Sequence, residues 1–463
     1  MNNLVLSPDS SKRYRHDVID KKDVISELPD SLLHHILSFL STRDAIRTSL
    51  LARRWKFLWT YLSDFNIKLE DRQKQIIHLF NQVDTILDKA EFIKRFSLLA
   101  FEDVDVDKVY CWTITLLLKH KIQELELSLN LRSPFLLANY LTVLKSLIVM
   151  DLELPCVLKV AGCVHFPCLK TLALHFITFV DETSAQQLFS GCPVLQKLTL
   201  ENCGWKNVQN VSIKIPTLTT LIIEDESDSI LNCKVTIDAV NLRSLSYNYN
   251  FIIELIPVGL TSLADAFIDV STIHPSLEQY TIPRAIRLFG GILHVKSLVL
   301  SKYALSTLSL AENLLSRLPT FHNLTHLGVD REMYDFTGEA LMDILEKSPK
   351  LEVLDIVDGF DQDYCSDGEV WTLRSVPHCI KHSLKLVRIT DFWGRVAEMQ
   401  FLIFLLKNAT VLRAVNISCG ESLSADLEKQ AEINNQLQAT RKGLPSCAIE
   451  FRCRGSCAKF LNQ

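Results

Sequence analysis

The stretch LKTLALHFITFVDETSAQQLFSGCPVLQKLTL, residues 169–200, holds one complete period of a repeating pattern. It opens with the frame apolar-x-x-apolar-x-apolar (LKTLAL), runs through DETSAQQLFS, and passes Gly191 and Pro193 before the frame returns as LQKLTL. Alternating apolar residues predict a strand, and the middle segment has helical spacing of its apolar residues. Glycine followed by proline predicts the helix end. We therefore predict one strand and one helical return leg in this period.

The same frame recurs along most of the chain, and its first six starts lie 22, 25, 26, 23 and 24 residues apart. This period is that of leucine-rich repeats, in which each layer can be covered only by its neighbours. The pattern weakens between Tyr247 and Val295, where we expect one or two irregular repeats. The eleven frames are IQELEL (122–127), LKSLIV (144–149), LKTLAL (169–174), LQKLTL (195–200), LTTLII (218–223), LRSLSY (242–247), VKSLVL (295–300), LTHLGV (324–329), LEVLDI (351–356), LKLVRI (384–389) and LRAVNI (412–417).

Composition narrows the function classes. The 463 residues are 48% hydrophobic and carry a formal charge of −5, which gives no global reason to bind nucleic acid and favours a protein partner. The longest apolar run, residues 401–406, is too short for a membrane span, and the polar amino terminus lacks a signal-peptide core. We expect a soluble intracellular protein, nuclear or cytosolic.

The sequence specifies no cofactor, metal site or catalytic centre. Glycine is scarce, and the GxGxxG, GxxxxGK[ST], G-x-S-x-G, H-E-x-x-H and kinase patterns do not occur. The 13 cysteines are scattered, so we expect thiols that pack as small hydrophobes in a reducing compartment. Two clusters lack the paired CxxC spacing of structural zinc sites: Cys163, His165 and Cys168, and Cys447, Cys453 and Cys457.

A second informative stretch is LPDSLLHHILSFLSTRDAIRTSLLARRWKFLW, residues 28–59. Half of its 32 residues are large apolar residues or alanine, more than so short a segment can hide within itself. Helical spacing predicts a first helix, Ser41 and Asp44 predict the start of a second, and R-R-W-x-x-L-W predicts a third.

From about Val376 the chain predicts a strand, a turn at Gly394, a helix with a Met399, Leu402, Ile403 and Leu406 stripe, and another strand. A polar helix and a last short strand follow within LSADLEKQAEINNQLQATRKGLPSCAIEF and could cap the open end of the solenoid.

The segment with LPDSLL, ILSFL, T-R-D-A and R-R-W-x-x-L-W resembles a plant F-box. The segment with VPHCIKHSLK, F-W-G and FLLKNATVL resembles the FBD domain. The whole chain is thus similar to the plant F-box/FBD/leucine-rich-repeat family. This implies an α/β fold: a three-helix F-box, a leucine-rich-repeat solenoid, and a closing α/β FBD region. The predicted boundaries are a polar tail (1–22), the F-box (23–67), the repeats (68–374), the FBD domain with its cap (375–453), and a second tail (454–463).

In this family the F-box docks on the Skp-type adaptor of an SCF ubiquitin ligase, and through it on cullin and RING subunits. The resemblance implies that nine residues form the adaptor contact, and we expect about half of them to face inward as a helical core. The alternative is that they form only the core of a helical cap on the solenoid. The nine are Leu28, Pro29, Leu32, Ile36, Leu37, Leu40, Trp55, Leu58 and Trp59.

The resemblance implies a non-catalytic receptor whose repeats recruit an unknown protein substrate for ubiquitination. The second hypothesis is a repeat scaffold with weak or no ligase assembly. We expect exposed strand positions to form the substrate surface, for example Lys197, Thr199 and Glu201, or His326, Gly328 and Asp330. No single residue among them can be assigned to a target.

Overall fold

A computed structural model describes the chain from the predicted F-box to its last strand. The two predicted tails lie outside the described residues, as do Cys163, Cys453 and Cys457. The described residues are 25–69, 76–131, 133–136, 145–160, 164–205, 207–225, 233–249, 253–269, 278–301, 304–305, 320–330, 337–357, 375–441 and 447–452.

Short helices form the amino-terminal unit, as predicted. They are α1 (Asp30–Ser38), α2 (Thr42–Arg47), η1 (Thr48–Leu50) and η2 (Arg53–Tyr61). The predicted start of the second helix is confirmed: Ser41 is its N-cap, and the Asp44 N–H donates to Ser41 Oγ at 3.1 Å. The third helix is wound as a 3₁₀-helix.

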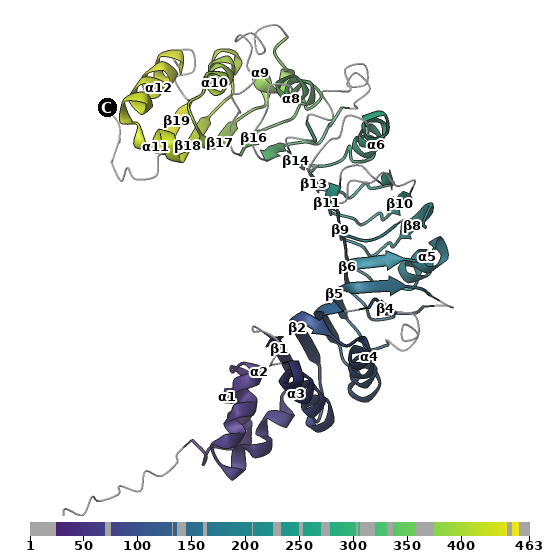
Figure 1. Cartoon of the computed structure of the whole chain (residues 1–463). Helices are drawn as coiled ribbons and strands as arrows, with labels where there is room; N and C mark the ends of the chain where they lie inside the picture. Colours follow the sequence, from purple (N-terminus) through teal and green to yellow (C-terminus); the bar gives the residue numbers. More distant parts are fainter. Residues whose placement is uncertain are drawn as a thin grey trace, which may run out of the picture.

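A 16-stranded sheet forms the rest of the main architecture, and all of its strand pairs are parallel. Figure 1 shows an arc with this sheet along its inner side and the helices α4, α5, α6, α8 and α10 outside it. The predicted repeat solenoid is therefore confirmed. The strands are β1 (Asp64–Leu69), β2 (Arg95–Val104), β3 (Glu124–Leu131), β4 (Phe135–Leu136), β5 (Val149–Leu158), β6 (Thr171–Phe179), β7 (Lys197–Glu201), β9 (Thr220–Asp225), β11 (Ser244–Tyr249), β13 (Asp265–Asp269), β14 (Ser297–Ser301), β15 (His326–Asp330), β16 (Val353–Ile356), β17 (Leu386–Phe392), β18 (Ala414–Cys419) and β19 (Ala448–Arg452).

Helical return legs connect many of these strands. The outer helices are α3 (Ile76–Lys89), α4 (Val106–Thr115), η3 (Leu116–His120), α5 (Glu182–Ser190), α6 (Glu278–Gly291), α8 (Thr337–Glu346), α9 (His378–His382), α10 (Val396–Asn408), α11 (Glu421–Ala425) and α12 (Leu427–Thr440). In β3, Leu125, Leu127 and Leu129 point into the solenoid and are buried, and the residues between them are more exposed. Each such side chain contributes roughly 1.5–3 kcal/mol when buried.

The register of one repeat differs from the prediction. The frame LKSLIV at 144–149 was predicted as a strand, but Val149 pairs with Glu124, so the frame that matches IQELEL is 147–152. Leu147, Met150 and Leu152 are the buried positions. The error arises because both hexamers satisfy the same apolar pattern, and only strand pairing separates them.

The sheet also contains strands that the eleven predicted frames did not include, namely β1, β2 and β13. Strands β1 and β2 precede the first frame, and β1 begins at Asp64, inside the segment predicted as F-box. In the weak region, β13 pairs in register with β11 and β14, so one ordinary strand stands there. Ala266 takes the position usually held by leucine, so the sequence of this strand departs from the leucine frame.

A second sheet of three parallel strands covers part of the outer side. It consists of β8 (Asn210–Lys214), β10 (Lys234–Asp238) and β12 (Glu254–Val258). Gln186 of α5 closes one edge: its Oε1 accepts from Ser212 N at 2.9 Å and its Nε2 donates to Ser212 O at 3.0 Å. This pairing replaces the ladder bonds that an edge strand lacks.

The FBD region continues the sheet instead of forming a separate layer. Strand β17 pairs with β16, and β18 pairs with β17 and β19. The predicted turn lies at Gly394, whose φ of +67° favours glycine, and a Cβ there would lie 2.4 Å from Ile433 of α12. In α10, Phe401 and Leu405 are buried alongside the predicted stripe, whereas Ile403 is half-buried.

Candidate functional site: an exposed apolar face on the amino-terminal helices

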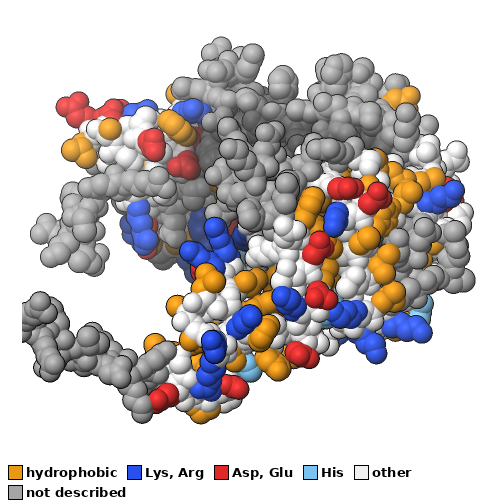
Figure 2. Space-filling model, turned by 60° about the horizontal axis from the view of Figure 1, so that its bottom comes forward, with side chains coloured by type: hydrophobic (Ala, Val, Ile, Leu, Met, Phe, Trp, Pro, Cys, Tyr) orange, Lys and Arg blue, Asp and Glu red, His pale blue; other side chains and the backbone are white. Residues whose placement is uncertain are grey.

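Exposed apolar side chains concentrate in the amino-terminal unit. Of the twenty exposed large hydrophobic side chains among the described residues, nine lie within one 37-residue segment, between Ile25 and Tyr61. The face seen in Figure 2 includes this end of the arc, with orange side chains among blue ones. Soluble monomers rarely expose contiguous apolar surface without a binding role.

Helix α1 carries two apolar stripes, one buried and one exposed. Leu33 and Leu37 are four residues apart and fully buried against the unit's own core. Leu32, Ile36 and Phe39 follow the i, i+4, i+7 spacing of another face and are 48%, 38% and 76% exposed. We call these three residues the α1 stripe. The helix therefore has one face for its own core and a second face that the described residues leave exposed.

The segment after α1 adds further apolar surface. Leu50 and Leu51, around η1, are 85% and 69% exposed, and Phe57 and Tyr61 of η2 are about half exposed. Between them, Trp55, Leu58 and Trp59 point inward and are buried. The aromatic ring of Trp59 meets Phe65 of β1 edge to face at 6.4 Å.

The nine residues predicted for the adaptor contact divide into three groups. Pro29, Leu32, Ile36 and Leu40 are exposed; Leu37, Trp55, Leu58 and Trp59 are buried; and Leu28 is half-buried against the core. The exposed residues that the prediction missed are Ile25, Phe39, Leu50, Leu51, Phe57 and Tyr61. Helical spacing could have found Phe39, seven residues after Leu32, because these two positions share a face.

Two side chains of η2 fix the turn before α1. Arg54 donates to Asp30 Oδ1 at 2.7 Å and also to the Ser26 carbonyl oxygen. Trp55 Nε1 donates to Ser26 Oγ at 2.7 Å. Charge-assisted bonds of this kind hold geometry well. The Leu-Pro turn is therefore held in place from the third helix.

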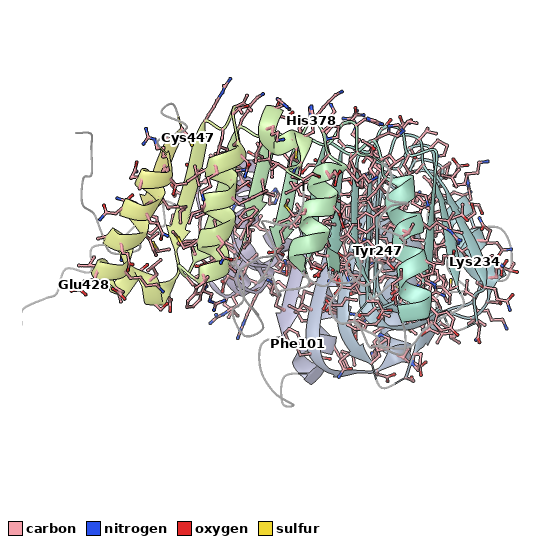
Figure 3. All side chains as sticks on the ribbon, turned by 90° about the horizontal axis from the view of Figure 1, so that it is seen from above. Phe101, Lys234, Tyr247, His378, Glu428 and Cys447 are labelled. Carbon is pink, nitrogen blue, oxygen red and sulfur yellow. The ribbon has the colours of Figure 1, made fainter. Side chains whose placement is uncertain are left out.

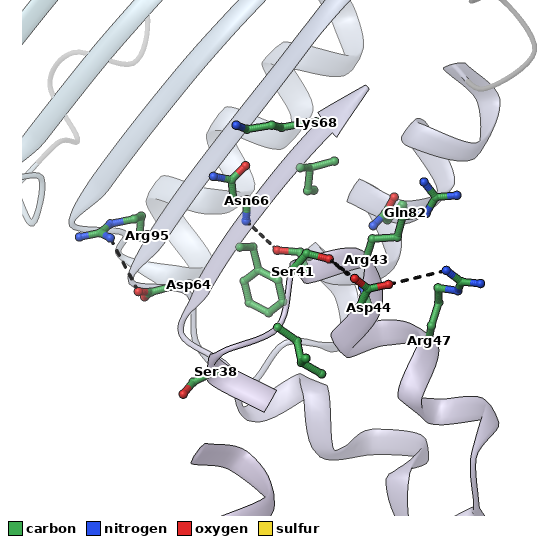
Figure 4. A pocket seen from close by; sticks show the side chains of 14 residues that line it. Ser38, Ser41, Arg43, Asp44, Arg47, Asp64, Asn66, Lys68, Gln82 and Arg95 are labelled. Carbon is green, nitrogen blue, oxygen red and sulfur yellow. Dashed lines mark hydrogen bonds and ion pairs between the residues drawn. The ribbon is translucent and has the colours of Figure 1, made fainter. Parts of the chain in front are cut away.

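A hydrogen bond also joins the amino-terminal helices to the first strand of the solenoid. Thr42 is buried at the start of α2, and its Oγ1 accepts from the Asn66 N–H of β1 at 2.7 Å. A hollow of about 950 Å³ lies beside this bond, and the side chains that line it include Arg43, Arg47, Lys68 and Arg95 (Figure 4). Two ion pairs join side chains that line it, Arg47 with Asp44 at 3.6 Å and Arg95 with Asp64 at 4.0 Å.

The inner side of the sheet carries charged side chains in register. His175 lies between two carboxylates, with Nδ1 2.8 Å from Glu201 Oε2 and Nε2 3.3 Å from Asp151 Oδ1. The hydrogen bond to Asp151 is the main cause that raises the pKa of His175, and burial opposes it. Of the predicted surface positions, Lys197 and His326 are exposed, whereas Glu201, Gly328 and Asp330 are half-buried. Thr199 was wrongly expected to be exposed: it is buried between Ala173 and Ile222 on the paired strands.

The described residues contain no group of three or more His, Cys, Asp or Glu side chains placed to hold a metal ion. Burial raises the pKa of the Cys192, Cys203, Cys233 and Cys379 thiols to about 12, so these are unreactive. Cys419 departs from the thiol prediction because it is disulfide-bonded. Among the described helices, none combines the length and the apolar character needed to cross a bilayer.

Comparison with protein families identifies three parts of the chain. The profile described as F-box domain matches residues 25–66, and the profile described as FBD matches residues 373–417. Between them, residues 111–256 match the repeats of "FBD-associated F-box protein At5g56370, LRR repeats". The predicted order of F-box, repeats and FBD region is thereby confirmed.

Similar curated proteins come from Arabidopsis thaliana. F-box/LRR-repeat protein At4g14103 is 29% identical over 73% of this chain and 92% of its own length. F-box/FBD/LRR-repeat protein At3g52680 is 27% identical over 97% of this chain and 98% of its own length. A solved structure, "Crystal structure of Rad7 and Elc1 complex in yeast", aligns with 86% of this chain at 13% identity, and its TM-score of 0.27 is too low to support a conclusion.

Proposed function

Because this chain belongs to the plant F-box/FBD/leucine-rich-repeat family, we propose that it is the substrate-recognition subunit of an SCF-type ubiquitin ligase. Its F-box docks on a Skp-type adaptor and, through it, on the cullin and RING subunits. The repeats hold a protein target. The chain itself is not an enzyme.

The observation that carries this proposal is the α1 stripe. Leu32, Ile36 and Phe39 extend one helix face whose neighbouring face already fills the core, and each leaves more than a third of its side chain exposed. Burying a side chain of this kind against a partner contributes roughly 1.5–3 kcal/mol. Protein interfaces concentrate their energy in a few such anchors. A helical cap on the solenoid, the alternative, would need no second apolar face.

The buried members of the predicted contact take a supporting role in this proposal. Leu37, Trp55, Leu58 and Trp59 form the core that fixes the angle between α1 and η2. Pro29, Leu32, Ile36 and Leu40 form the contact itself, together with the more exposed Phe39. Leu28 packs behind Pro29 and sets the entry into α1.

The mechanism is proximity. A target bound to the repeats is held near a ubiquitin-charged conjugating enzyme, which raises the effective concentration of its lysines. The Thr42–Asn66 hydrogen bond and the Trp59–Phe65 contact fix the F-box to the first strand, so the two binding surfaces keep one relative position.

The test is co-purification of the full chain with a Skp-type adaptor and cullin. Replacing Leu32, Ile36 and Phe39 with serine should abolish recovery of both. The matched control replaces Val396, Val411 and Leu427, which are exposed at the other end of the chain, with serine and should recover both at the wild-type level. A wild-type chain that recovers neither would instead favour the repeat scaffold without ligase assembly.

A further inference from the structure

Four cations lie along one edge of the main sheet, on four of the six strands from β6 to β14. Because the sheet is parallel, all strands begin at this edge, which Cys447 and His378 mark in Figure 3, opposite Phe101. The four lie at or just before the starts of β6, β7, β11 and β14, and all are exposed. We call them the amino-edge cations: Lys170, Lys197, Arg243 and Lys296.

The amino-edge cations have no side-chain hydrogen bond or ion pair with any part of the chain that the structure describes. In each of the six strands from β6 to β14, the starting positions are the first residue of the strand and the residue just before it. Among these described positions, Asp265 is the one acidic residue. The other charged pairs nearby are already satisfied, as in Arg95 with Glu124 and Lys385 with Glu352. A row of free positive charge is unusual in a chain with a formal charge of −5.

The fifth residues of the same strands, and of β5 beside them, form a mostly acidic row that contains His175. Glu153, His175, Glu201 and Glu224 are paired partners on β5, β6, β7 and β9, and Asp269 continues this row on β13. Burial, and then repulsion from Glu201 and Asp269, raises the pKa of Glu224. The sheet is therefore positive at its amino edge and mostly acidic along this second row, and Figure 2 shows blue side chains following one another along the lower margin of the face it draws.

We propose that the amino edge from β6 to β14 binds an acidic, extended segment of the protein target. The proposal rests on the receptor role above and names the class of target that this role requires. The cations attract carboxylates without first breaking internal ion pairs, and the acidic row repels the same segment, so the target binds at one edge and in one position.

The dimensions of the row fit a peptide. From β6 to β14 the sheet has five strand-to-strand steps, which span about 24 Å. An extended peptide covers this distance with about seven residues. Duplex DNA fits this edge less well than a peptide. It carries one charge per about 1.7 Å of its axis, and its phosphates would be repelled by Glu201, which ends the short strand that begins with Lys197.

The test measures binding of a labelled 14-residue Glu-Ser repeat peptide to the full chain by fluorescence anisotropy. Replacing Lys170, Lys197, Arg243 and Lys296 with glutamine should weaken binding at least tenfold. A control with the same loss of charge replaces Lys108, Lys159, Lys214 and Lys234 with glutamine and should change binding less than twofold. Raising the salt from 50 to 200 mM should weaken wild-type binding and have little effect on the edge variant.

Three results would overturn the proposal. Equal weakening in both variants would show a general charge effect, and tighter binding of a Lys-Ser peptide would place the site on the acidic row. Tighter binding of a 14-nucleotide RNA, lost in the edge variant, would make the edge a nucleic-acid site. The ligase role is judged separately by adaptor recovery: an edge variant that keeps the adaptor but loses the peptide supports the edge site, and a wild type that binds the peptide without the adaptor keeps the edge site and removes the ligase role.

Discussion

Helices α1 and α12 lie near the two ends of one solenoid, and both bury an apolar pair at i, i+4 spacing: Leu33 with Leu37, and Ile433 with Leu437. They differ on the opposite face. In α12 that face is polar apart from Leu427 and two small alanines, Ala431 and Ala439, whereas α1 exposes Leu32, Ile36 and Phe39. A polar outer face is what a terminal cap of a solenoid needs. The difference is what the proposed docking role predicts: α1 keeps an apolar face for a partner, whereas α12 presents a mainly polar face to solvent.

The largest expected effect separates the two stripes of α1. Replacing Leu33 and Leu37 with alanine should destabilise the F-box by roughly 2–5 kcal/mol for each residue, because both leave cavities in its core. Replacing Leu32 and Ile36 with alanine should change stability by under about 0.5 kcal/mol each. Hydrogen exchange of the F-box amides checks both. Equal destabilisation by the two pairs would show that the exposed stripe is core after all.

The next largest expected effect is on the stability of the carboxyl-terminal region, at the turn before α10. Glu398 is fully buried and accepts from the N–H groups of Trp393 at 3.1 Å and Arg395 at 2.8 Å, which closes the turn before α10. Replacing it with alanine should cost about 3 kcal/mol of unfolding free energy and leave adaptor recovery unchanged. Urea unfolding measures the first quantity. The exposed Glu432 of α12, replaced with alanine, is the control, and a similar cost there would contradict this assignment.

The sequence predicted correctly those features that neighbouring residues determine, and it failed where distant residues decide the structure. The period of the repeats fixed the parallel sheet, and the turn chemistry placed Ser41 and Gly394 correctly. Register at residues 144–152 depended on pairing with a strand more than twenty residues away, which a local pattern does not contain. Two of the three residues of the α1 stripe were predicted, and Phe39 was missed for a similar reason. Motif positions marked Leu32 and Ile36 together with buried Leu37, and only packing shows which of them faces outward.

At the amino-terminal end, a smaller effect on adaptor affinity is expected from the Leu-Pro turn. Replacing Leu28 and Pro29 with alanine should weaken adaptor binding by about 100-fold, equivalent to about 2.7 kcal/mol, because Pro29 is exposed and Leu28 sets its position. Calorimetry with the purified adaptor measures the affinity, and circular dichroism checks that the repeats stay folded. The double alanine variant of Val411 and Leu427 should bind normally. Undiminished affinity in the Leu28 and Pro29 variant would remove this turn from the contact.

The smallest effect lies between the two ends, at His175. Its folded pKa is raised above the ordinary value by Asp151 and Glu201, and Glu153 and Glu224 lie on the neighbouring strands of the same row. A raised pKa means that the ion pairs stabilise the fold fully below the unfolded pKa and that this contribution is lost as the pH rises through the folded value. Replacing His175 with glutamine should therefore cost about 0.5 kcal/mol at pH 5.5, as for partly exposed ion pairs, and less at pH 8.5. Urea unfolding at both pH values checks the sign, and a cost that grows with pH would contradict the protonated state of His175.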